Sequence, residues 1–457
     1  MASPIPAGFH ALPLSAIQLS LAAVLKCGQS FRWTCYPLPS SSDTESFPTH
    51  EYRLCLRDRV VCLRQSSDYL FYRSERVSDE ETLIWLKDYF QLDVDLVKLY
   101  DQWSDRDQVF NNLRSRFSGI RILRQDPWEN LVSFICSSNN NIPRITKMVH
   151  ALCKQYSPSL ISLPPPEISE SDSQDHAAYH PFPPPSLLAV PEVKSTLRGL
   201  GFGYRADYIQ RTAKMLVDTH GSSMSNSESR ENCEEWLTGL RDMSTEAARE
   251  ELLKFVGVGR KVADCVLLMS LDKKEVIPVD THVYQIAIKH YGLRTIGGSK
   301  GKGVMTPRIY DEVATKLADI WGEYAGWAHS ARIYSKLPFF FQVLFTADLK
   351  AFSSFGIEPP TPATSIMDVG TSALVSSSSS KRKHSETRNE VEVQRKLKLM
   401  GVAVAAIAAA ATVIAAVHDD PSWLEDDSDD LSSVDSEEDA SSPTSRRVKR
   451  RRRSFDR

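Results

Sequence analysis

The stretch 255–280 constrains this chain more than any other part of it. Gly257 and Gly259 flank a single residue and interrupt a helical pattern, and the helix that follows carries Lys261 in its first turn. Glycines permit a tight turn and a close approach of the backbone. The free N–H groups at the start of the next helix favour a phosphate. The pattern therefore predicts a phosphate-binding hairpin, with a plain turn between two helices as the alternative.

Lys261 and Asp280 are the candidate catalytic residues of this stretch. The position of the lysine at a helix N-terminus and its apolar neighbours both disfavour the ammonium form. A neutral lysine can act as a nucleophile and form a Schiff base. Asp280 would cap the next helix, and an ionised carboxylate there could stabilise positive charge on a sugar ring or assist proton transfer. A solvated lysine and a simple helix cap are the alternatives.

The chain as a whole predicts an α+β fold. In the first part, short β-rich runs at 29–33, 52–56, 60–63 and 69–72 alternate with polar or Pro/Ser-rich breaks, which is typical of an antiparallel sheet. Farther on, apolar periodicity and helix-start signals such as Asp126-Pro127 predict helices. We expect an N-terminal antiparallel sheet domain with helices at 8–125, packed on a mainly α-helical domain at 126–350. Residues 157–191 are rich in Pro and Ser and are expected to form a surface insertion or a partly disordered loop.

Residues 351–457 are predicted to be a disordered tail with an acidic and a basic run. The tail holds 11 acidic residues between 419 and 439, then seven basic residues among the eight at 446–453, and such blocks are normally solvated. The apolar run 402–417 is shorter than the ~20 residues that span a bilayer, so no membrane contact is expected. The basic block is typical of a nuclear import signal. We expect a nuclear protein, with the mitochondrion as the alternative location.

The charge balance argues against a generally basic DNA-binding surface, and the cysteine spacing argues against a metal site. Residues 1–350 hold 40 Lys+Arg and 41 Asp+Glu, so contact with nucleic acid must depend on local features such as helix N-termini. The eight cysteines include no C-x-x-C pair and no tight quartet. A zinc or iron–sulfur site is therefore not expected.

Six separated motifs resemble those of one enzyme family. The sequence is similar to the helix-hairpin-helix glycosylases of base-excision repair, and most of all to the eukaryotic 8-oxoguanine DNA glycosylase/AP lyases. The motifs are C-G-Q-S-F-R-W at 27–33, D-P-W-E-N-L-V-S-F-I-C-S-S-N-N-N-I-P-R-I at 126–145, G-L-G-F-G-Y-R-A at 199–206, the hairpin with P-V-D-T-H, W-G-E-Y-A-G-W-A at 321–328 and V-L-F-T-A-D-L at 343–349. The resemblance implies that the helical part is a helix-hairpin-helix domain.

The resemblance also implies an activity. A bifunctional enzyme of this kind flips 8-oxoguanine out of duplex DNA opposite cytosine. Lys261 would displace the base and form a Schiff base with the sugar, and β-elimination would then nick the strand. Asp280 would be the essential partner of Lys261. No cofactor and no catalytic metal are implied, and we expect a monomer whose partner is double-stranded DNA containing oxidised guanine. The alternatives are a glycosylase for another damaged base and a non-catalytic helix-hairpin-helix DNA-binding protein.

Other site residues follow from the resemblance by position. The damaged-base pocket would comprise Gly28, whose carbonyl accepts the N7–H of the oxidised base, with Cys265, Met269, Phe345 and either His329 or Gln342. The last two stay open because residues 331–342 intervene where the family continues directly, as a true insertion or a gene-model artefact. Recognition of the unpaired cytosine would fall to Asn139, Arg144, Arg205 and the wedge residue Tyr204.

Phosphate contacts are implied for the hairpin and the next helix. These are assigned to Gly257, Gly259 and His282. The carbonyls of Phe255 and Val258 would hold a structural cation that bridges to a DNA phosphate. Val256 stands where the family usually has proline, which should reduce the rigidity of the hairpin without changing the chemistry.

Overall fold

The computed structural model describes residues 5–38, 48–112, 114–166, 176–224, 230–293 and 305–334. Phe345, Gln342 and the predicted tail at 351–457 lie outside these residues, as does most of the segment 331–342. Within the described residues, no helix is long and apolar enough to cross a membrane.

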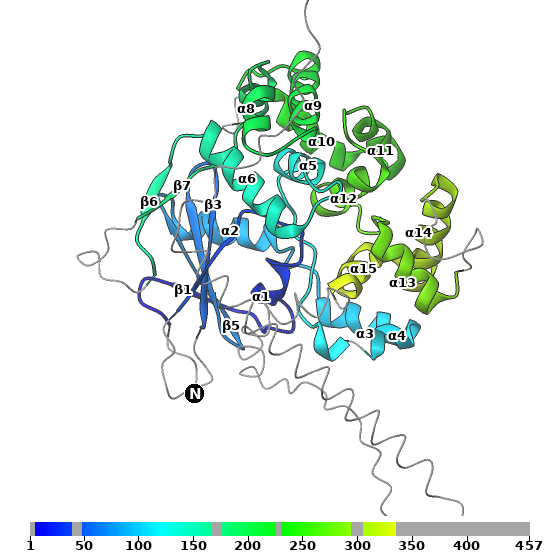
Figure 1. Cartoon of the computed structure of the whole chain (residues 1–457). Coiled ribbons are helices and arrows are strands. Elements are labelled where there is room, and N and C mark those ends of the chain that lie inside the picture. Colours follow the sequence, from blue (N-terminus) through cyan, green and yellow to red (C-terminus); the bar gives the residue numbers. More distant parts are fainter. Residues whose placement is uncertain are drawn as a thin grey trace, which may run out of the picture. The chain divides into compact units, whose positions relative to one another are not determined.

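A five-stranded antiparallel sheet forms the N-terminal part of the fold (Figure 1), as predicted. Its strands, in the spatial order β1-β5-β4-β3-β2, are β1 (His10–Pro13), β2 (Thr34–Pro37), β3 (His50–Cys55), β4 (Val60–Gln65) and β5 (Tyr69–Glu75). Leu63 pairs with Tyr52 on one side and Tyr72 on the other. Every residue of β4 is buried, because both faces of the sheet are covered.

The two faces are covered by different parts of the chain. Leu54, Val61 and Leu63 pack in a cluster with Leu86 of helix α2 (Asp79–Tyr89). On the other face, Val60, Cys62 and Phe71 pack with Leu163 and Tyr179. The last two belong to a hairpin of β6 (Ile161–Leu163) and β7 (Ala177–Tyr179).

This hairpin changes the interpretation of the segment 157–191. The sequence predicts a surface insertion there, but its few apolar residues pack against the sheet. Phe182 is also buried, and the chain continues into α7 (Pro185–Ala189). The prolines permit this because they lie outside the two three-residue strands.

A strand that the sequence predicts at 29–33 does not form. Gln29 and Arg32 are buried through specific polar contacts, so the segment does not alternate between an apolar and a solvated face. Gln29 Nε2 donates to the Arg121 carbonyl at 3.0 Å, and Arg32 Nη1 donates to the Cys55 carbonyl at 2.6 Å. The strand begins only at Thr34.

The remaining helices build the second part of the fold, which is mainly α-helical as predicted. Further helices precede residue 126 in the chain, namely α1 (Leu21–Val24), α3 (Leu96–Arg106) and α4 (Gln108–Asn111). The helices that follow are α5 (Pro127–Ile135), α6 (Ile142–Tyr156), α8 (Val193–Gly199), α9 (Arg205–His220), α10 (Asn232–Gly239), α11 (Thr245–Leu253), α12 (Arg260–Ser270), α13 (Thr281–Tyr291), α14 (Pro307–Trp321) and α15 (Ala325–Tyr334). Although α3 and α4 precede residue 126, their residues Leu99, Trp103 and Phe110 join the core of the helical part.

Helices α5 and α12 lie side by side in the helical part (Figure 1). Nearly every residue of both is buried. At one end the Asn130 amide donates to the Ser270 hydroxyl, and at the other Lys261 contacts Ser137, just beyond α5. The two helices therefore run antiparallel, so the C-terminal end of α5 meets the N-terminal end of α12.

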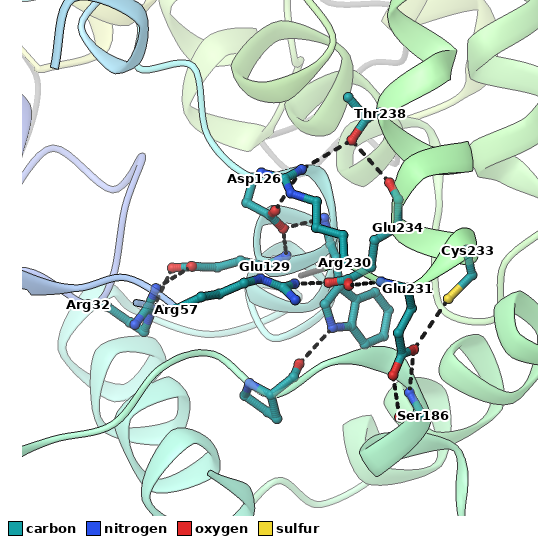
Figure 2. A network of polar contacts seen from close by, with 12 residues as sticks. Arg32, Arg57, Asp126, Glu129, Ser186, Arg230, Glu231, Cys233, Glu234 and Thr238 are labelled. Carbon is teal, nitrogen blue, oxygen red and sulfur yellow. Dashed lines mark hydrogen bonds and ion pairs between the residues drawn. The ribbon is translucent and has the colours of Figure 1, made fainter. Parts of the chain in front are cut away.

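A polar network joins the sheet to the helical part, as Figure 2 shows. Arg32, before β2, binds both carboxylate oxygens of Glu129 on α5 at 2.8 and 2.5 Å. Arg57, from the turn between β3 and β4, forms an ion pair with Glu234 on α10. These side chains are largely buried, so removing one partner would leave an uncompensated charge at the junction.

Candidate active site

The hairpin between α11 and α12 has the tight turn that its glycines predict. Gly257 has a φ of +81°, and an added Cβ would lie 2.4 Å from Cδ2 of Tyr208. Val258 N donates to the Phe255 carbonyl at 3.3 Å. Thr212 Oγ1 donates to the Val256 carbonyl at 3.0 Å. The turn is thus fixed against α9 on one side, while Gly259 starts α12 at its N-cap position.

The two glycines predict different effects of the same substitution. Gly257→Ala should destabilise the fold by roughly 2–4 kcal/mol, because Cβ would overlap Tyr208 in a left-handed backbone conformation. Gly259→Ala is the matched control, since its added Cβ would meet no described residue within 4 Å. Urea unfolding of both variants measures the difference. Equal losses of stability would show that the contact with Tyr208 does not determine the turn.

Lys261 lies at the meeting point of α12 and α5. Its Nζ donates to Ser137 Oγ at 3.2 Å and lies 4.8 Å from the centroid of the Phe134 ring. The side chain is half-buried. A lysine amine is thus held at a helix N-terminus beside an aromatic face, with part of its surface open to a ligand.

Asp280 caps α13, as predicted. One carboxylate oxygen, Oδ1, accepts hydrogen bonds from His282 N and Val283 N, both at 2.9 Å. Both bonds go to Oδ1, so the second oxygen, Oδ2, takes no part in the cap. The cap fixes the direction of the carboxylate in the way the sequence indicates.

His329 and Cys265 share the surroundings of this pair. Burial lowers the pKa of His329 to about 4, and the charges of Asp280 and Lys261 act on it in opposite directions. Burial also raises the pKa of the Cys265 thiol to about 11, against the effect of Lys261. Both side chains are therefore neutral at physiological pH. Among the described residues, neither ring nitrogen of His329 has a hydrogen-bond partner, so the imidazole can bind a polar group of a ligand.

Helix α15 is fixed tightly one turn before His329. Gly326 N donates to the Lys274 carbonyl at 3.0 Å. An added Cβ on Gly326 would lie 2.3 Å from the Val276 carbonyl oxygen. The helix therefore lies directly on the connection between α12 and α13, and this contact determines where His329 enters the site.

The other residues predicted for the damaged-base pocket have fewer contacts with Lys261, Asp280 and His329. Met269 is buried on the same face of α12 as Cys265, two turns after Lys261. Gly28 has a φ of +87°, and an added Cβ would lie 3.0 Å from Cδ1 of Ile142 at the start of α6. Phe345 and Gln342 lie outside the described residues, so their places in the damaged-base pocket stay predictions.

The predicted cytosine-reading residues form a second group. Tyr204 Oη donates to the Ser138 carbonyl at 3.1 Å, and Arg205 Nη2 donates to the Asn139 carbonyl at 3.2 Å. Asn139 has a φ of +48° at the tip of the loop between α5 and α6. Arg144 Nη2 donates to the Gly201 carbonyl at 3.3 Å. Two loops distant in the sequence are therefore joined, with exposed Tyr204, Asn139 and Arg144 at their surface.

His282 and the hairpin carbonyls have simple surroundings. The His282 side chain is exposed in the first turn of α13, where it can reach a ligand in solvent. The Phe255 carbonyl accepts the Val258 N–H, which leaves one of its lone pairs for a cation. In the part of the chain that the structure describes, no three His, Cys, Asp or Glu side chains are grouped as metal ligands.

A cavity of about 550 Å³ lies elsewhere, at the N-terminal end of α5. It adjoins the network of Figure 2, and its walls include Arg57, Asp126 and Arg241. Among the described residues, those lining this cavity include none that the sequence predicts for the site. Since Lys261 contacts the opposite end of α5, this cavity is separate from the candidate active site.

The residues that support the site are not among those predicted from the sequence. Ser137 and Phe134 contact Lys261, and Asp264 on α12 binds Arg249 and Tyr310. Asp264 stands inside an otherwise apolar stretch of α12, and a buried carboxylate needs partners. That position was the signal available in the sequence, although it does not identify the partners.

Comparison with known proteins assigns the chain to a family. Residues 11–131 match the family model "8-oxoguanine DNA glycosylase, N-terminal domain", and residues 132–303 match "HhH-GPD superfamily base excision DNA repair protein". The N-glycosylase/DNA lyase of Saccharomyces cerevisiae is 36% identical over 346 residues, which cover 72% of this chain and 86% of the yeast protein. The chain belongs to the N-glycosylase/DNA lyase family.

Further relatives agree with this N-glycosylase/DNA lyase assignment. The Arabidopsis thaliana N-glycosylase/DNA lyase OGG1 is 35% identical over 331 residues, covering 72% of this chain and 80% of its own. A Clostridium acetobutylicum 8-oxoguanine glycosylase/lyase, solved with double-stranded DNA containing cytosine opposite 8-oxoguanine, is 26% identical. Its TM-score is 0.53, with 70% of this chain and 91% of that chain covered. The predicted fold class and enzyme class, a bifunctional glycosylase and lyase acting on DNA, are confirmed.

Proposed function

We propose that this N-glycosylase/DNA lyase removes 8-oxoguanine paired with cytosine in duplex DNA and then cleaves the strand through a lysine Schiff base. The observation that carries the proposal is the placement of Lys261. Its amine lies at the N-terminus of a buried helix, 3.2 Å from Ser137 Oγ, with Asp280 and His329 in its electrostatic surroundings. Binding of a phosphate by the hairpin would require neither Lys261 nor Asp280.

The reaction begins at the sugar of the flipped nucleotide. Lys261 Nζ attacks C1′, the N-glycosidic bond breaks, and its electron pair leaves with the base. Asp280, held by its two backbone amide contacts, stabilises the positive charge that develops on the sugar. Opening of the sugar ring gives a protonated Schiff base between Nζ and C1′. Loss of a C2′ proton then expels the 3′ phosphate, which nicks the strand.

The damaged base would occupy the space lined by His329, Cys265 and Met269, with the Gly28 carbonyl as acceptor for N7–H. His329 is neutral, so its ring presents one donor and one acceptor to the base. We give this role to His329 because it lies in the electrostatic surroundings of Asp280 and Lys261, and Gln342 lies outside the described residues.

The opposite cytosine would be read by the second group of residues. Arg144 is exposed and has donors remaining after its bond to the Gly201 carbonyl. Arg205 is buried and bonded to the carbonyls of Ser138 and Asn139, so we assign it to holding the loop. Tyr204 would fill the gap in the duplex. Gly257, Gly259 and His282 would contact phosphates, with a structural cation at Phe255 and Val258.

The neutral state of His329 predicts how stability depends on pH. Since burial lowers its pKa to about 4, the unfolded chain binds a proton between pH 6.5 and 4 that the folded chain does not. The free energy of unfolding should therefore decrease as the pH is lowered from 6.5 to 4. This group contributes at most about 3 kcal/mol to the decrease. His329→Gln should remove this part of the dependence in urea unfolding without DNA. Exposed His282→Gln is the control, and equal slopes for both variants would contradict the prediction.

The oligomeric state and the cellular location also belong to the proposal. We propose that the enzyme acts as a monomer on damaged duplex DNA and that it is imported into the nucleus by its basic run at 446–453 with Lys381-Arg382-Lys383. Light scattering at assay concentration tests the first point. Fluorescence microscopy of the full chain, with and without neutralised basic residues, tests the second. A variant that enters the nucleus as the wild type does would contradict the assigned signal.

The substrate is tested with duplexes that differ by one base. Borohydride trapping should give a covalent complex with 8-oxoguanine opposite cytosine, and markedly less with 8-oxoguanine opposite adenine. Undamaged duplex should give no complex. Equal trapping opposite cytosine and adenine would contradict the proposed reading of cytosine. Preferred trapping on a duplex with another damaged base would replace the proposed substrate.

A further inference from the structure

A buried carboxylate on α12 lies one turn after the proposed nucleophile. Asp264 is 1% exposed, and its two oxygens accept three hydrogen bonds from three helices. Oδ1 accepts from Arg249 Nε of α11 at 2.7 Å, and Oδ2 accepts from Arg260 Nε at 3.2 Å and from the Tyr310 hydroxyl of α14 at 2.7 Å. The charge is thus compensated inside the protein, and its direction is fixed from both sides.

Tyr310 links this carboxylate to the backbone that leads to Asp280. Its hydroxyl oxygen accepts a hydrogen bond from Val279 N at 2.9 Å. Since the carboxylate of Asp264 only accepts, the single hydroxyl proton must point to Asp264. Burial and the neighbouring Asp264 raise the pKa of Tyr310, so the hydroxyl keeps its proton. The guanidinium of Arg260 lies 4.9 Å from the centroid of the Tyr310 ring and limits its movement.

We propose that Tyr310 is a positioning residue, which together with Asp264 fixes Asp280 relative to Lys261. The bonds run from Asp264, three residues after Lys261, through the Tyr310 hydroxyl to Val279 N, one residue before Asp280. The two proposed catalytic side chains lie on different helices, α12 and the cap of α13. Eight residues, 272–279, connect Leu271 at the end of α12 to Asp280 at the start of α13, so the backbone connection alone does not determine their spacing. The Tyr310 hydroxyl supplies a short connection between them.

A reaction of this kind depends strongly on such spacing. A misplacement of about 1 Å at reacting groups can cost about a hundredfold in rate. Without the hydroxyl, Val279 N would lose its acceptor in a buried place, and the segment before Asp280 would be free to shift. Tyr310 itself touches neither DNA nor the reacting atoms in this arrangement, so its loss should change kcat and not KM.

The experiment compares two tyrosines that each bind one carboxylate, the buried Tyr310 and the half-buried Tyr291. Tyr310→Phe should lower kcat on a duplex with 8-oxoguanine opposite cytosine by about tenfold or more, with KM unchanged within about twofold. Tyr291→Phe is the matched control. Its hydroxyl donates to Asp107 Oδ2 at 2.6 Å at the other end of α13, and its removal should leave both constants within about twofold. Both variants are assayed at a temperature where circular dichroism shows them folded.

The inference rests on the proposed function, and a second measurement separates the two. Hydrogen exchange of the peptide 276–284 in the full chain should be faster in Tyr310→Phe than in the wild type and Tyr291→Phe. This readout requires no activity. Faster exchange with normal kcat would overturn the positioning role, and unchanged exchange would overturn the connection itself. If Lys261→Gln still traps DNA, the proposed chemistry fails, while the exchange result still decides whether Tyr310 holds the segment.

Discussion

Lys261→Gln abolishes borohydride trapping and lowers base excision by about a thousandfold or more. The expectation follows from the geometry of the amine, which contacts Ser137 Oγ and the Phe134 ring at the junction of α5 and α12. An amide of similar length can occupy that place but cannot form a Schiff base, and losing a nucleophile removes most of an enzyme's rate enhancement. Single-turnover cleavage and trapping on a duplex with 8-oxoguanine opposite cytosine measure the two effects.

The control for this substitution lies on the neighbouring helix end. Lys254 is exposed, and its Nζ pairs with Glu251 at 2.7 Å. Lys254→Gln removes the same charge close to the hairpin and should keep trapping and excision near the wild-type level. Duplex binding by Lys261→Gln should persist in a gel-shift assay. Trapping that survives in Lys261→Gln would assign the nucleophile to another residue.

Asp280→Asn separates the structural from the chemical role of that residue. Asparagine caps a helix about as well as aspartate does, so the contacts with His282 N and Val283 N can be kept. The free energy of unfolding should change by less than about 1 kcal/mol, mostly through the lost interaction with the helix dipole. Excision should fall by about a hundredfold or more, because the charge that stabilises the sugar is gone. Urea unfolding and single-turnover excision are the two measurements.

A second capping aspartate provides the comparison. Asp95 caps α3, where its carboxylate accepts from Lys98 N at 3.3 Å and from Gln18 Nε2 at 2.7 Å. Asp95→Asn makes the same chemical change away from the site, and excision should stay near the wild-type rate. Equal rates for Asp280→Asn and the wild type would limit Asp280 to its cap.

Local signals in the sequence predict much of the fold. Asp126 before Pro127 and Asp280 before Thr281 start helices as their chemistry requires, because an N-cap depends only on the next few residues. Three of the β-rich runs become β3, β4 and β5 for a similar reason. These three strands follow one another in the chain and pair with one another, so their pairing needs no distant segment.

Features that depend on distant partners could not be predicted in this way. The hairpin of β6 and β7 forms because Leu163 and Tyr179 cover a sheet face built a hundred residues earlier. Tyr310 has no local signal, since its role comes from Asp264 and Val279 on other segments. His329 was one of two alternatives in the sequence, and only the packing of α15 through Gly326 places it beside the proposed catalytic pair.

The antiparallel pairing of α5 with α12 has a consequence for the order of folding. Lys261 and Ser137 are 124 positions apart, and closing so long a loop is slow compared with forming the local hairpins of the sheet. During synthesis the sheet can fold while α12 is still unmade. The proposed nucleophile then reaches its place only after the intervening helices have formed, and α15 follows later still. A chain that ends before residue 261 therefore lacks the proposed nucleophile, whatever part of the sheet it has already formed.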